Sequence, residues 1–481
     1  MKKEEKNEKG LTAEKDDFSE RFSELMIKAD LADYSDVSGC IILKPSSYAM
    51  WEKIIEETNK RFKRLEIKNV YFPLFIPEKF LNKEKEHVEG FSPEVAWVTH
   101  AGNSKLNERL AVRPTSETII YPSFSKWIRS WRDLPLRYNL WNNVVRWEFK
   151  HPVPFFRGRE FLWNELHTVL ENEEEARKEG KEILEIYDDI CKNVLALYGV
   201  KGKKTDYEKF AGGVESWKLH YIMQNGKCAE GPCFHYDGQN FAKAFDIKFL
   251  DREGKTQYAH QCTYAISTRM LGVMFAIHSD DKGLIIPPRI APNKIVIVPI
   301  IFEEKKKEVL DFAKKIKKEL EEFEPILDER DNYSPGYKFN EWELKGIPIR
   351  IEIGPKEVEK ESVVLFRRDI RKKEEVKVKD LKKRIKEILE EIQDFLFNRS
   401  KKLFESKLDK AEILEELKKK IKDKKVCLVP ICKKENCADI IKAETSGAKV
   451  LWIDERNKVK NEKCIVCGEK ADFFVYAGKS Y

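Results

Sequence analysis

The pattern of apolar residues changes near residue 292, and this change constrains the fold more than any other feature. Before it, one predicted helix, 171–198, interrupts a cluster of strand-like segments at 95–99, 143–150, 159–170, 241–250, 257–267 and 283–287. After it, the buried strand in NKIVIVPIIF, a helix at 303–323 and the strands IPIRIEI and SVVLFRRD form an alternating α/β unit. A chain of 481 residues with two such patterns is too long for one hydrophobic core.

The flanking segments complete a prediction of four parts. The charged segment 1–17 is expected to be a tail, followed by domains at 18–291, 292–395 and 396–481. Helical spacing of apolar residues begins at Phe18 and recurs in YAMWEKIIEETNKRFKRL, and a long charged helix or helix pair is expected at 379–424. The prolines in VYFPLFIP suggest a strand at an edge or an interface.

Composition narrows the class of protein. Hydrophobic residues make up 41% of the chain, which suits folded domains. No run of about 18 apolar residues occurs, and the first twenty residues are highly charged, so we expect a cytoplasmic protein that does not contact a membrane. The net charge of +7 fits a polyanionic partner, although lysine excess also solvates surfaces. Ten cysteines in that compartment are expected to be reduced thiols or metal ligands.

The stretch RWEFKHPVPFFRGREF has the residues of a phosphate site. Arg146 and Arg157 flank a proline-bearing loop, so a strand–loop–strand hairpin would bring both guanidinium groups to one pocket, where each fork matches a phosphate. Glu148 would orient them or accept from a nucleotide, and Phe161 can stack on a purine. The competing interpretation is a surface hairpin with weak ion pairs. No glycine-rich phosphate loop occurs, so side chains would have to hold a phosphate.

Two further stretches fit the same pocket. LAVRPTSET sets the hydroxyl of Thr115 two residues before the carboxylate of Glu117, a pair that would hold a ligand's ammonium group. A helix N-cap at Thr115 or Ser116 is the alternative. ISTRMLGV adds the guanidinium of Arg269.

These stretches, with GQNFAKAF, GLIIPPRIAP and PGYKFNEWELKGIPIRIEIGPKE in the same order, resemble prolyl-tRNA synthetases of the archaeal and eukaryotic type, from about residue 18 to Tyr481. The resemblance implies an α+β multidomain fold. Its parts would be the antiparallel sheet of class II synthetases flanked by helices, an α/β anticodon-binding domain and a small C-terminal zinc-binding α/β domain. The implied activity is ATP-dependent attachment of L-proline to tRNA(Pro) through a prolyl-adenylate, by a homodimer that uses Mg²⁺. The alternative is a non-catalytic paralogue that binds tRNA.

The resemblance also assigns roles to residues. Arg146 would bridge the α-phosphate and the proline carboxylate, and Arg157 and Arg269 would hold the terminal phosphates, while Phe161 and Glu148 would contact adenine. Thr115 and Glu117 would bind the imino nitrogen of proline. The walls around the proline ring would come from Trp163, His167, Phe210 and His235.

The chain departs from the family pattern in its nucleotide-binding segment. Glu230 and Cys233 stand where the family usually has glutamine and threonine, and Ala265 stands where it tends to have glycine. A second metal site would be an alternative use of this region, with ligands Cys228, Cys233, His235 and Cys262. The interval from His167 to Arg269 has no room for a large editing insertion.

The C-terminal half carries two further sets of candidate residues. Glu343, Arg350 and Lys356 match positions that in the family read anticodon bases, although an exposed ion pair is the alternative for Arg350. Cysteines form two pairs separated by 26 residues, a pattern typical of a four-coordinate structural zinc site: Cys432, Cys437, Cys464 and Cys467. Cys427 lies outside this pattern and is expected to be a core thiol. The segment VYFPLFIP is the expected dimer contact.

Overall fold

A computed structural model describes residues 11–13, 17–81, 94–148 and 152–481 of the chain. Most of the predicted tail, and residues 149–150 of one predicted strand, lie outside the described residues. Within the described ranges, no helix is both long enough and apolar enough to cross a bilayer.

A sheet of eleven strands forms the centre of the molecule, in the order β20-β21-β23-β22-β9-β10-β11-β14-β8-β7-β3. The half of this sheet from β9 to β3 comes from the predicted 18–291 domain, and it runs antiparallel from β9 to β7. Its strands are β9 (Val200–Lys203), β10 (Glu215–Ile222), β11 (Cys228–Gly238), β14 (His260–Ala265), β8 (Glu160–Leu170) and β7 (Leu136–Val145), with the short β3 (Lys68–Asn69) parallel at the edge. The predicted antiparallel sheet flanked by helices is confirmed.

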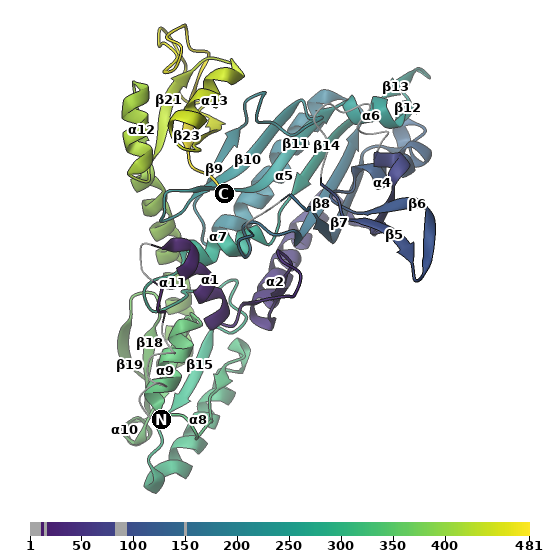
Figure 1. The fold of residues 1–481 in the computed structure, drawn as a ribbon. Coiled ribbons are helices and arrows are strands. Elements are labelled where there is room, and N and C mark those ends of the chain that lie inside the picture. Colours follow the sequence, from purple (N-terminus) through teal and green to yellow (C-terminus); the bar gives the residue numbers. More distant parts are fainter. Residues whose placement is uncertain (1–10, 14–16, 82–93, 149–151) are drawn as a thin grey trace.

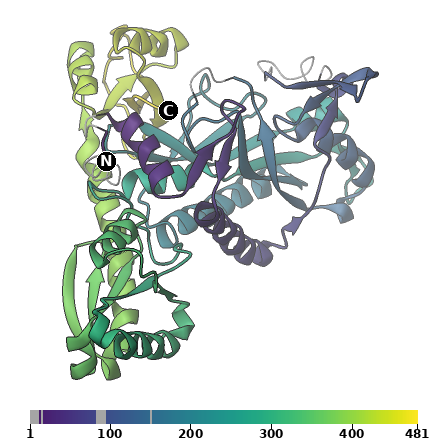
Figure 2. The ribbon, with the colours of Figure 1, turned by 60° about the horizontal axis from the view of Figure 1, so that its bottom comes forward.

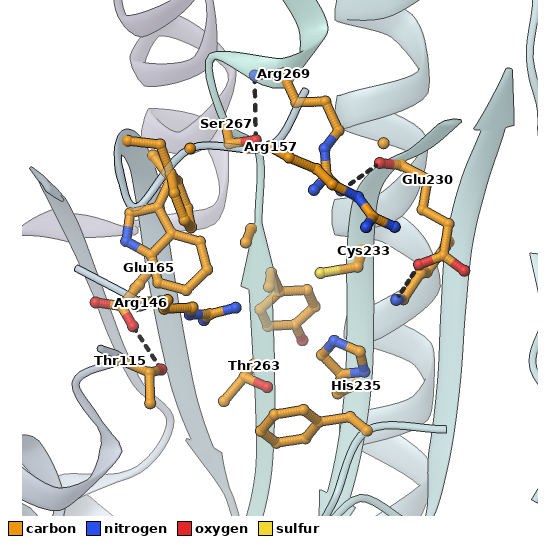
Figure 3. Close-up of a pocket in the computed structure, with 18 of the residues that line it drawn as sticks. Thr115, Arg146, Arg157, Glu165, Glu230, Cys233, His235, Thr263, Ser267 and Arg269 are labelled. Atoms are coloured by element: carbon orange, nitrogen blue, oxygen red, sulfur yellow. Dashed lines mark hydrogen bonds and ion pairs between the residues drawn. The ribbon is translucent and has the colours of Figure 1, made fainter. Parts of the chain in front are cut away.

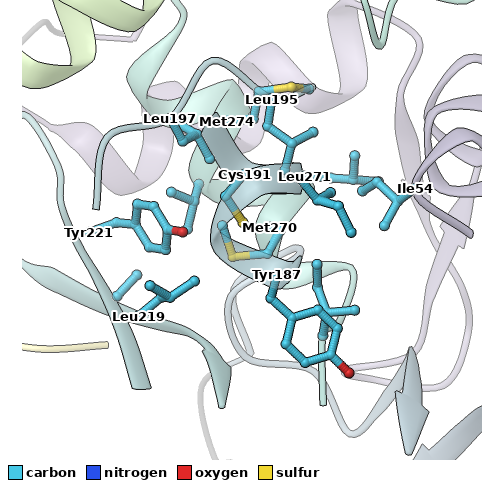
Figure 4. Close-up of a cluster of buried hydrophobic side chains, with 14 of the residues drawn as sticks. Ile54, Tyr187, Cys191, Leu195, Leu197, Leu219, Tyr221, Met270, Leu271 and Met274 are labelled. Atoms are coloured by element: carbon cyan, nitrogen blue, oxygen red, sulfur yellow. The ribbon is translucent and has the colours of Figure 1, made fainter. Parts of the chain in front are cut away.

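Helix α5 (Glu173–Asn193) covers one face of this sheet. Asn172 caps its N-terminus by accepting from the Glu175 N–H at 2.9 Å, and three glutamates in the first turn complement the helix dipole. At Gly180 a Cβ atom would lie 2.0 Å from the ring of Phe234 on β11, so only glycine permits this approach. The face of α5 that carries Tyr187 and Cys191 packs with α2 (Pro45–Phe62) and α7 (Arg269–Ile277) in the largest buried cluster (Figure 4).

The α/β unit after residue 292 is a separate five-stranded sheet, in the order β16-β15-β17-β18-β19. Its strands are β15 (Ile295–Pro299), β16 (Ile326–Leu327), β17 (Ile349–Ile353), β18 (Ser362–Arg367) and β19 (Lys372–Lys377). Strand β15 is parallel to β16 and β17, whereas β18 pairs antiparallel with β17 and β19 pairs antiparallel with β18. Three helices pack against this sheet: α8 (Lys306–Glu319), α9 (Pro335–Leu344) and α10 (Pro355–Lys360). The predicted alternating α/β unit is confirmed.

Helix α11 (Val378–Lys407) leads from this unit to the C-terminal module, which we define as residues 408–481. Figures 1 and 2 show the two units at opposite ends of α11, both on the same side of the 18–291 domain. Because α11 is continuous, the expected limit between residues 395 and 396 falls inside one helix. The predicted long helix or pair proves to be α11 and the shorter α12 (Leu414–Lys422).

The C-terminal module extends the central sheet. It contains helix α13 (Glu435–Glu444) and the strands β20 (Leu408–Lys410), β21 (Val426–Ile431), β22 (Lys449–Ile453) and β23 (Phe473–Gly478). Strand β22 joins the strands of the 18–291 domain through the pair Ile453 and Lys203 on β9. The C-terminus then returns to the 18–291 domain: the Tyr481 N–H donates to the Cys228 carbonyl at 3.1 Å, and its ring stacks on Phe156 at 4.5 Å.

The N-terminal part frames the same domain. Helix α1 (Phe18–Lys28) and α2 agree with the helices predicted there. A two-stranded sheet pairs β1 (Ala32–Tyr34) with β2 (Ile41–Leu43), and a three-stranded sheet joins β4 (Phe75–Pro77), β6 (Ser104–Val112) and β5 (Trp97–Ala101). Helix α4 (Glu117–Trp127) follows β6.

Two strand predictions are wrong. Residues 241–250 form helix α6 (Asn240–Phe245) and only then strand β12 (Lys248–Leu250), which pairs with β13 (Thr256–Tyr258), because the apolar side chains of the first half are buried at helical spacing. Residues 283–287 form no strand. Gly283 has φ +139°, and the N–H groups of Leu284 and Ile286 donate to the carbonyls of Leu344 and Gly346. The sequence analysis did not predict strands β10 and β11; in β11, glycine and proline interrupt CAEGPCFHYDG.

Candidate active site

A cavity of about 290 Å³ opens on the face of the sheet opposite α5 (Figure 3). The predicted site residues that line it are Thr115, Glu117, Arg146, Arg157, Phe161, Trp163, His167, Phe210, Glu230, Cys233, His235 and Arg269. Glu148 does not line it and is exposed to solvent. The structure therefore brings together the nucleotide and proline candidates from distant parts of the chain, with Glu148 as the exception.

The hairpin of β7 and β8 places the arginine stretch as expected. Arg146 directly follows β7, its backbone N–H donates to the Arg159 carbonyl at 2.7 Å, and its Nε donates to the Pro114 carbonyl at 2.9 Å. Its guanidinium carbon lies 5.6 Å from the ring centroid of Phe161 and 5.1 Å from that of Trp163. Aromatic faces thus hold a charged fork inside the cavity, and the surface-hairpin alternative is wrong for Arg146.

Arg269 begins α7 and enters the cavity from the same end as Arg157 (Figure 3). Its Nε donates to the Phe156 carbonyl at 3.2 Å and its Nη1 to the Glu230 carbonyl at 3.0 Å. Burial lowers its pKa, an effect that the charge of Glu230 opposes, but a guanidinium remains protonated at neutral pH. This end of the cavity is therefore cationic and suited to an anionic ligand.

Glu117 and Thr115 lie at the other end, with a third group that the sequence analysis missed. Thr115 Oγ1 donates to Glu165 Oε1 at 2.9 Å and is also hydrogen-bonded to Glu117, and the Ser116 N–H donates to Glu165 Oε1 at 2.9 Å. Ser116 is the N-cap residue of α4, but its hydroxyl bonds Glu165 and makes no cap hydrogen bond. Strand alternation could have identified Glu165, because it lies on the same face of β8 as Trp163 and His167.

Burial and the charge of Glu165 raise the pKa of Glu117 to about 7. The hydroxyl of Thr115 and the charge of Arg146 act in the opposite direction. Because ionisation of this buried carboxyl group is unfavourable, a cationic ligand beside it would stabilise the ionised form.

Paired strands build the wall beside this carboxylate. His235, Thr263 and His167 lie opposite one another on β11, β14 and β8. Phe210 packs on the His235 ring at 4.8 Å between centroids, and the Nδ1 atoms of His235 and His167 contact Ser216 Oγ at 2.7 Å and Tyr121 Oη at 3.2 Å. Burial lowers the pKa of His167 to about 4 and of His235 to about 3, so both imidazoles are neutral at pH 7.

The unusual residue Glu230 proves to be ion-paired. Its carboxylate accepts from Lys204 Nζ at 2.8 Å and from Lys218 Nζ at 2.5 Å, and both lysines were missed in the sequence. The alternative second metal site is wrong. Cys233 and His235 face the cavity, whereas Cys262 Sγ contacts the Ala176 carbonyl on the α5 side, and within the described residues these thiols and imidazole form no ligating group.

A second cluster lies in the C-terminal module. The sulfur atoms of Cys432, Cys437, Cys464 and Cys467 all lie within 4.8 Å of one another, with Cys432 Sγ 3.5 Å from Cys437 Sγ and 3.8 Å from Cys467 Sγ. Tetrahedral zinc with Zn–S bonds of about 2.3 Å requires sulfur separations of about 3.8 Å. The four thiols therefore fit a structural zinc ion. Cys427 is buried in β21 outside this cluster, as expected.

The anticodon candidates lie in the five-stranded domain but differ in exposure. Lys356 is exposed at the start of α10, and Glu343 at the end of α9 is paired with Arg371 Nε at 3.0 Å. Arg350 on β17 is buried, its guanidinium lies between the rings of Phe339 and Phe366, and Arg350 Nη2 donates to Glu352 Oε1 at 2.8 Å. The geometry does not support direct base contact by Arg350, and the exposed-pair alternative is wrong as well.

An antiparallel sheet that carries a cationic cavity and is joined to an α/β domain is the architecture of class II aminoacyl-tRNA synthetases. Residues 97–278 match the tRNA synthetase class II core domain (G, H, P, S and T), residues 294–388 match the anticodon binding domain, and residues 414–481 match the prolyl-tRNA synthetase C-terminal domain.

Full-length relatives narrow the class. The chain is 44% identical to proline–tRNA ligase 2 of Bacillus cereus (strain ATCC 10987 / NRS 248) over 98% of each chain. It is also 44% identical to proline–tRNA ligase 2 of Clostridioides difficile (strain 630), over 99% of this chain and 100% of the relative. The crystal structure of prolyl-tRNA synthetase from Cryptosporidium parvum, complexed with halofuginone and AMPPNP, superposes with a TM-score of 0.93 at 41% identity, covering 98% of this chain and 99% of that one. The chain belongs to the proline–tRNA ligase family.

Proposed function

We propose that the protein attaches L-proline to tRNA(Pro) in two steps, through a prolyl-adenylate. The observation that carries this proposal is a single cavity with cationic guanidinium groups at one end and a buried carboxylate at the other. Arg146 lies between these ends, where the phosphate of one substrate meets the carboxylate of the other (Figure 3). Family membership supports the same activity.

In the first step an oxygen of the proline carboxylate attacks the α-phosphorus of ATP, and pyrophosphate leaves. This nucleophile is already ionised at neutral pH, so no general base is required, and catalysis consists of positioning and charge stabilisation. Arg146 binds the α-phosphate and the proline carboxylate, while Arg157 and Arg269 bind the terminal phosphates. ATP enters as its magnesium complex, and the ion neutralises part of the phosphate charge.

The roles of the remaining cavity residues follow from where they lie. Glu117 and Thr115 bind the imino nitrogen, since the buried carboxylate gains a cation there. The pyrrolidine ring lies against the wall that consists of Trp163, His167, Phe210 and His235. Phe161 stacks on adenine, Glu230 and Cys233 belong to the nucleotide half, and Glu148 reaches adenine only if its exposed segment folds over ATP.

In the second step the prolyl group passes to the terminal ribose of the tRNA. Glu343 and Lys356 contact anticodon bases, and Arg350 supports that surface from beneath through Glu352. The domain limits that suit these roles are 18–291, 292–407 with helix α11 included, and 408–481, with structural zinc in the last. Exposed Tyr71 (82%) and Phe75 (44%) in VYFPLFIP support a homodimer contact there. We place the enzyme in the cytoplasm. We also place it in the archaeal and eukaryotic subtype, since residues 168–268 hold strands and helices of the domain itself with no inserted domain.

Amino-acid-dependent ATP–pyrophosphate exchange tests the proposal, run with all twenty amino acids and repeated with Arg146→Ala. Exchange should rise with proline alone and vanish in the variant, because Arg146 contacts both reacting groups. If folded, zinc-loaded protein gave no exchange with any amino acid, the non-catalytic, tRNA-binding alternative would replace the enzyme.

A further inference from the structure

Lys204 is a buried cation at the junction of the catalytic sheet and the C-terminal module. It directly follows β9, and only 2% of its side chain is exposed. Its ammonium donates to Glu230 Oε1 at 2.8 Å and to the Leu451 carbonyl of β22 at 2.9 Å, with Glu208 Oε2 further away at 3.9 Å. One ammonium group thus binds both a carboxylate of the nucleotide cavity and the backbone of the C-terminal module.

The strands on either side leave little freedom for this contact. Ile453 of β22 pairs with Lys203 of β9. At Gly202 a Cβ atom would lie 2.3 Å from Trp452 Cβ, and the Trp452 ring packs on His220 of β10 at 4.6 Å between centroids. The backbone of β22 is therefore a fixed reference for the Lys204 ammonium.

On the cavity side, Glu230 connects to two cations that line the site. Lys218 Nζ binds its other carboxylate oxygen at 2.5 Å, and Arg269 Nη1 donates to its backbone carbonyl at 3.0 Å. Burial opposes ionisation of this carboxylate, but the charges of Lys218 and Lys204 hold the pKa of Glu230 well below its usual range. The segment of β11 that orients Arg269 is therefore held by an ionised residue with two lysine partners.

We propose that Lys204 is a positioning residue that holds the nucleotide half of the active site in register with the C-terminal module, acting through Glu230 on Lys218 and Arg269. The inference rests on the proposed function, in which Arg269 binds phosphate. Thr115 and Glu117, which bind proline in that function, belong to the opposite side of the cavity, and among the described residues the hydrogen bonds and ion pairs of Lys204 go to Glu230, Leu451 and Glu208 instead. Loss of Lys204 should therefore weaken ATP binding selectively.

The test measures KM for ATP and KM for proline in ATP–pyrophosphate exchange with Lys204→Met, which keeps the length of the side chain and removes its charge. KM for ATP should rise at least fivefold, and KM for proline should change less than twofold. Lys204→Arg, which keeps the charge, should recover most of the loss. The matched control is Lys201→Met on the same strand. Its ammonium pairs with Glu185 and Asp188 of α5, away from the cavity, and Asp188 keeps Lys192 as a partner, so both KM values should stay unchanged.

A second variant separates positioning from folding. Glu230→Gln removes the charge that Lys204 holds, so it should raise KM for ATP selectively, and adding Lys204→Met to it should change KM for ATP less than twofold further. The inference is overturned if Lys204→Met leaves KM for ATP unchanged, raises both KM values equally, or adds its full effect to Glu230→Gln. Wild-type protein without proline-dependent exchange would instead overturn the proposed function.

Discussion

In the proposed function, proline should bind less tightly as pH falls through 7, because the carboxyl group assigned to its imino nitrogen titrates there. Glu117 is buried beside Glu165, and these surroundings raise its pKa to about 7. The carboxylate is the form that binds a cation, so affinity is full above this pH and is lost below it.

The expected magnitude follows from the ionised fraction of Glu117. With a pKa of about 7, roughly a tenth of the carboxyl groups are ionised at pH 6 and roughly nine tenths at pH 8. The dissociation constant of proline should therefore be about tenfold higher at pH 6, a change of about 1.4 kcal/mol in binding free energy. The neighbouring imidazoles cannot produce this effect, since the pKa values of His167 and His235 are about 4 and about 3.

Isothermal titration of the nucleotide-free protein with proline, from pH 6 to pH 8.5, measures this dependence directly. The matched control is Glu117→Gln, which keeps the shape of the side chain and removes its titration. This variant should bind proline weakly at every pH, with a flat profile. A constant dissociation constant in the wild-type protein, or the same slope in Glu117→Gln, would refute the assignment of Glu117.

Three further predictions concern the zinc content and the stability of the protein. Wild-type protein should carry one zinc ion per chain, which Cys464→Ser loses and Cys427→Ala keeps, as metal analysis of purified protein would show. Gly180→Ala should destabilise the catalytic domain by about 3 kcal/mol, because the new Cβ overlaps a buried ring, and an unchanged thermal midpoint would contradict this packing. Arg368→Met should cost about 2 kcal/mol, because Asp280 loses the donors from both Nη atoms of Arg368 at 2.7 and 2.8 Å and keeps the backbone N–H groups of Lys282 and Gly283; a denaturation midpoint within error of wild type would show that the pair is dispensable.

The sequence predicted those parts of the fold whose apolar spacing or charge pattern is visible within one short segment. The hairpin that carries Arg146 and Arg157, the helices near the N-terminus and the α/β unit all show periodic apolar residues or fixed charges within a few dozen positions. Segment 241–250 misled the prediction because its aromatic residues suit a strand, whereas burial against α4 and the sheet selects a helix for its first half.

Site residues could be predicted where the side chain itself suits the ligand. They could not be predicted where the role depends on a partner that is distant in the sequence. Glu165 could have been found from strand alternation. Lys204 could not, since its partners Glu230 and Leu451 are 26 and 247 positions away in the chain. Arg350 shows the reverse error, because a guanidinium that suggests base recognition in the sequence is enclosed between two rings in the fold.

The continuous helix α11 limits how this chain can change length. Its 30 residues span about 45 Å and form the single covalent connection between the α/β domain and the C-terminal module. Each inserted or deleted residue would rotate one end relative to the other by about 100° and shift it by about 1.5 Å. Such a change is incompatible with the pairing of β22 with β9 as long as the α/β domain keeps its position. Length variation between these two domains is therefore confined to steps near whole helical turns or to loops outside α11.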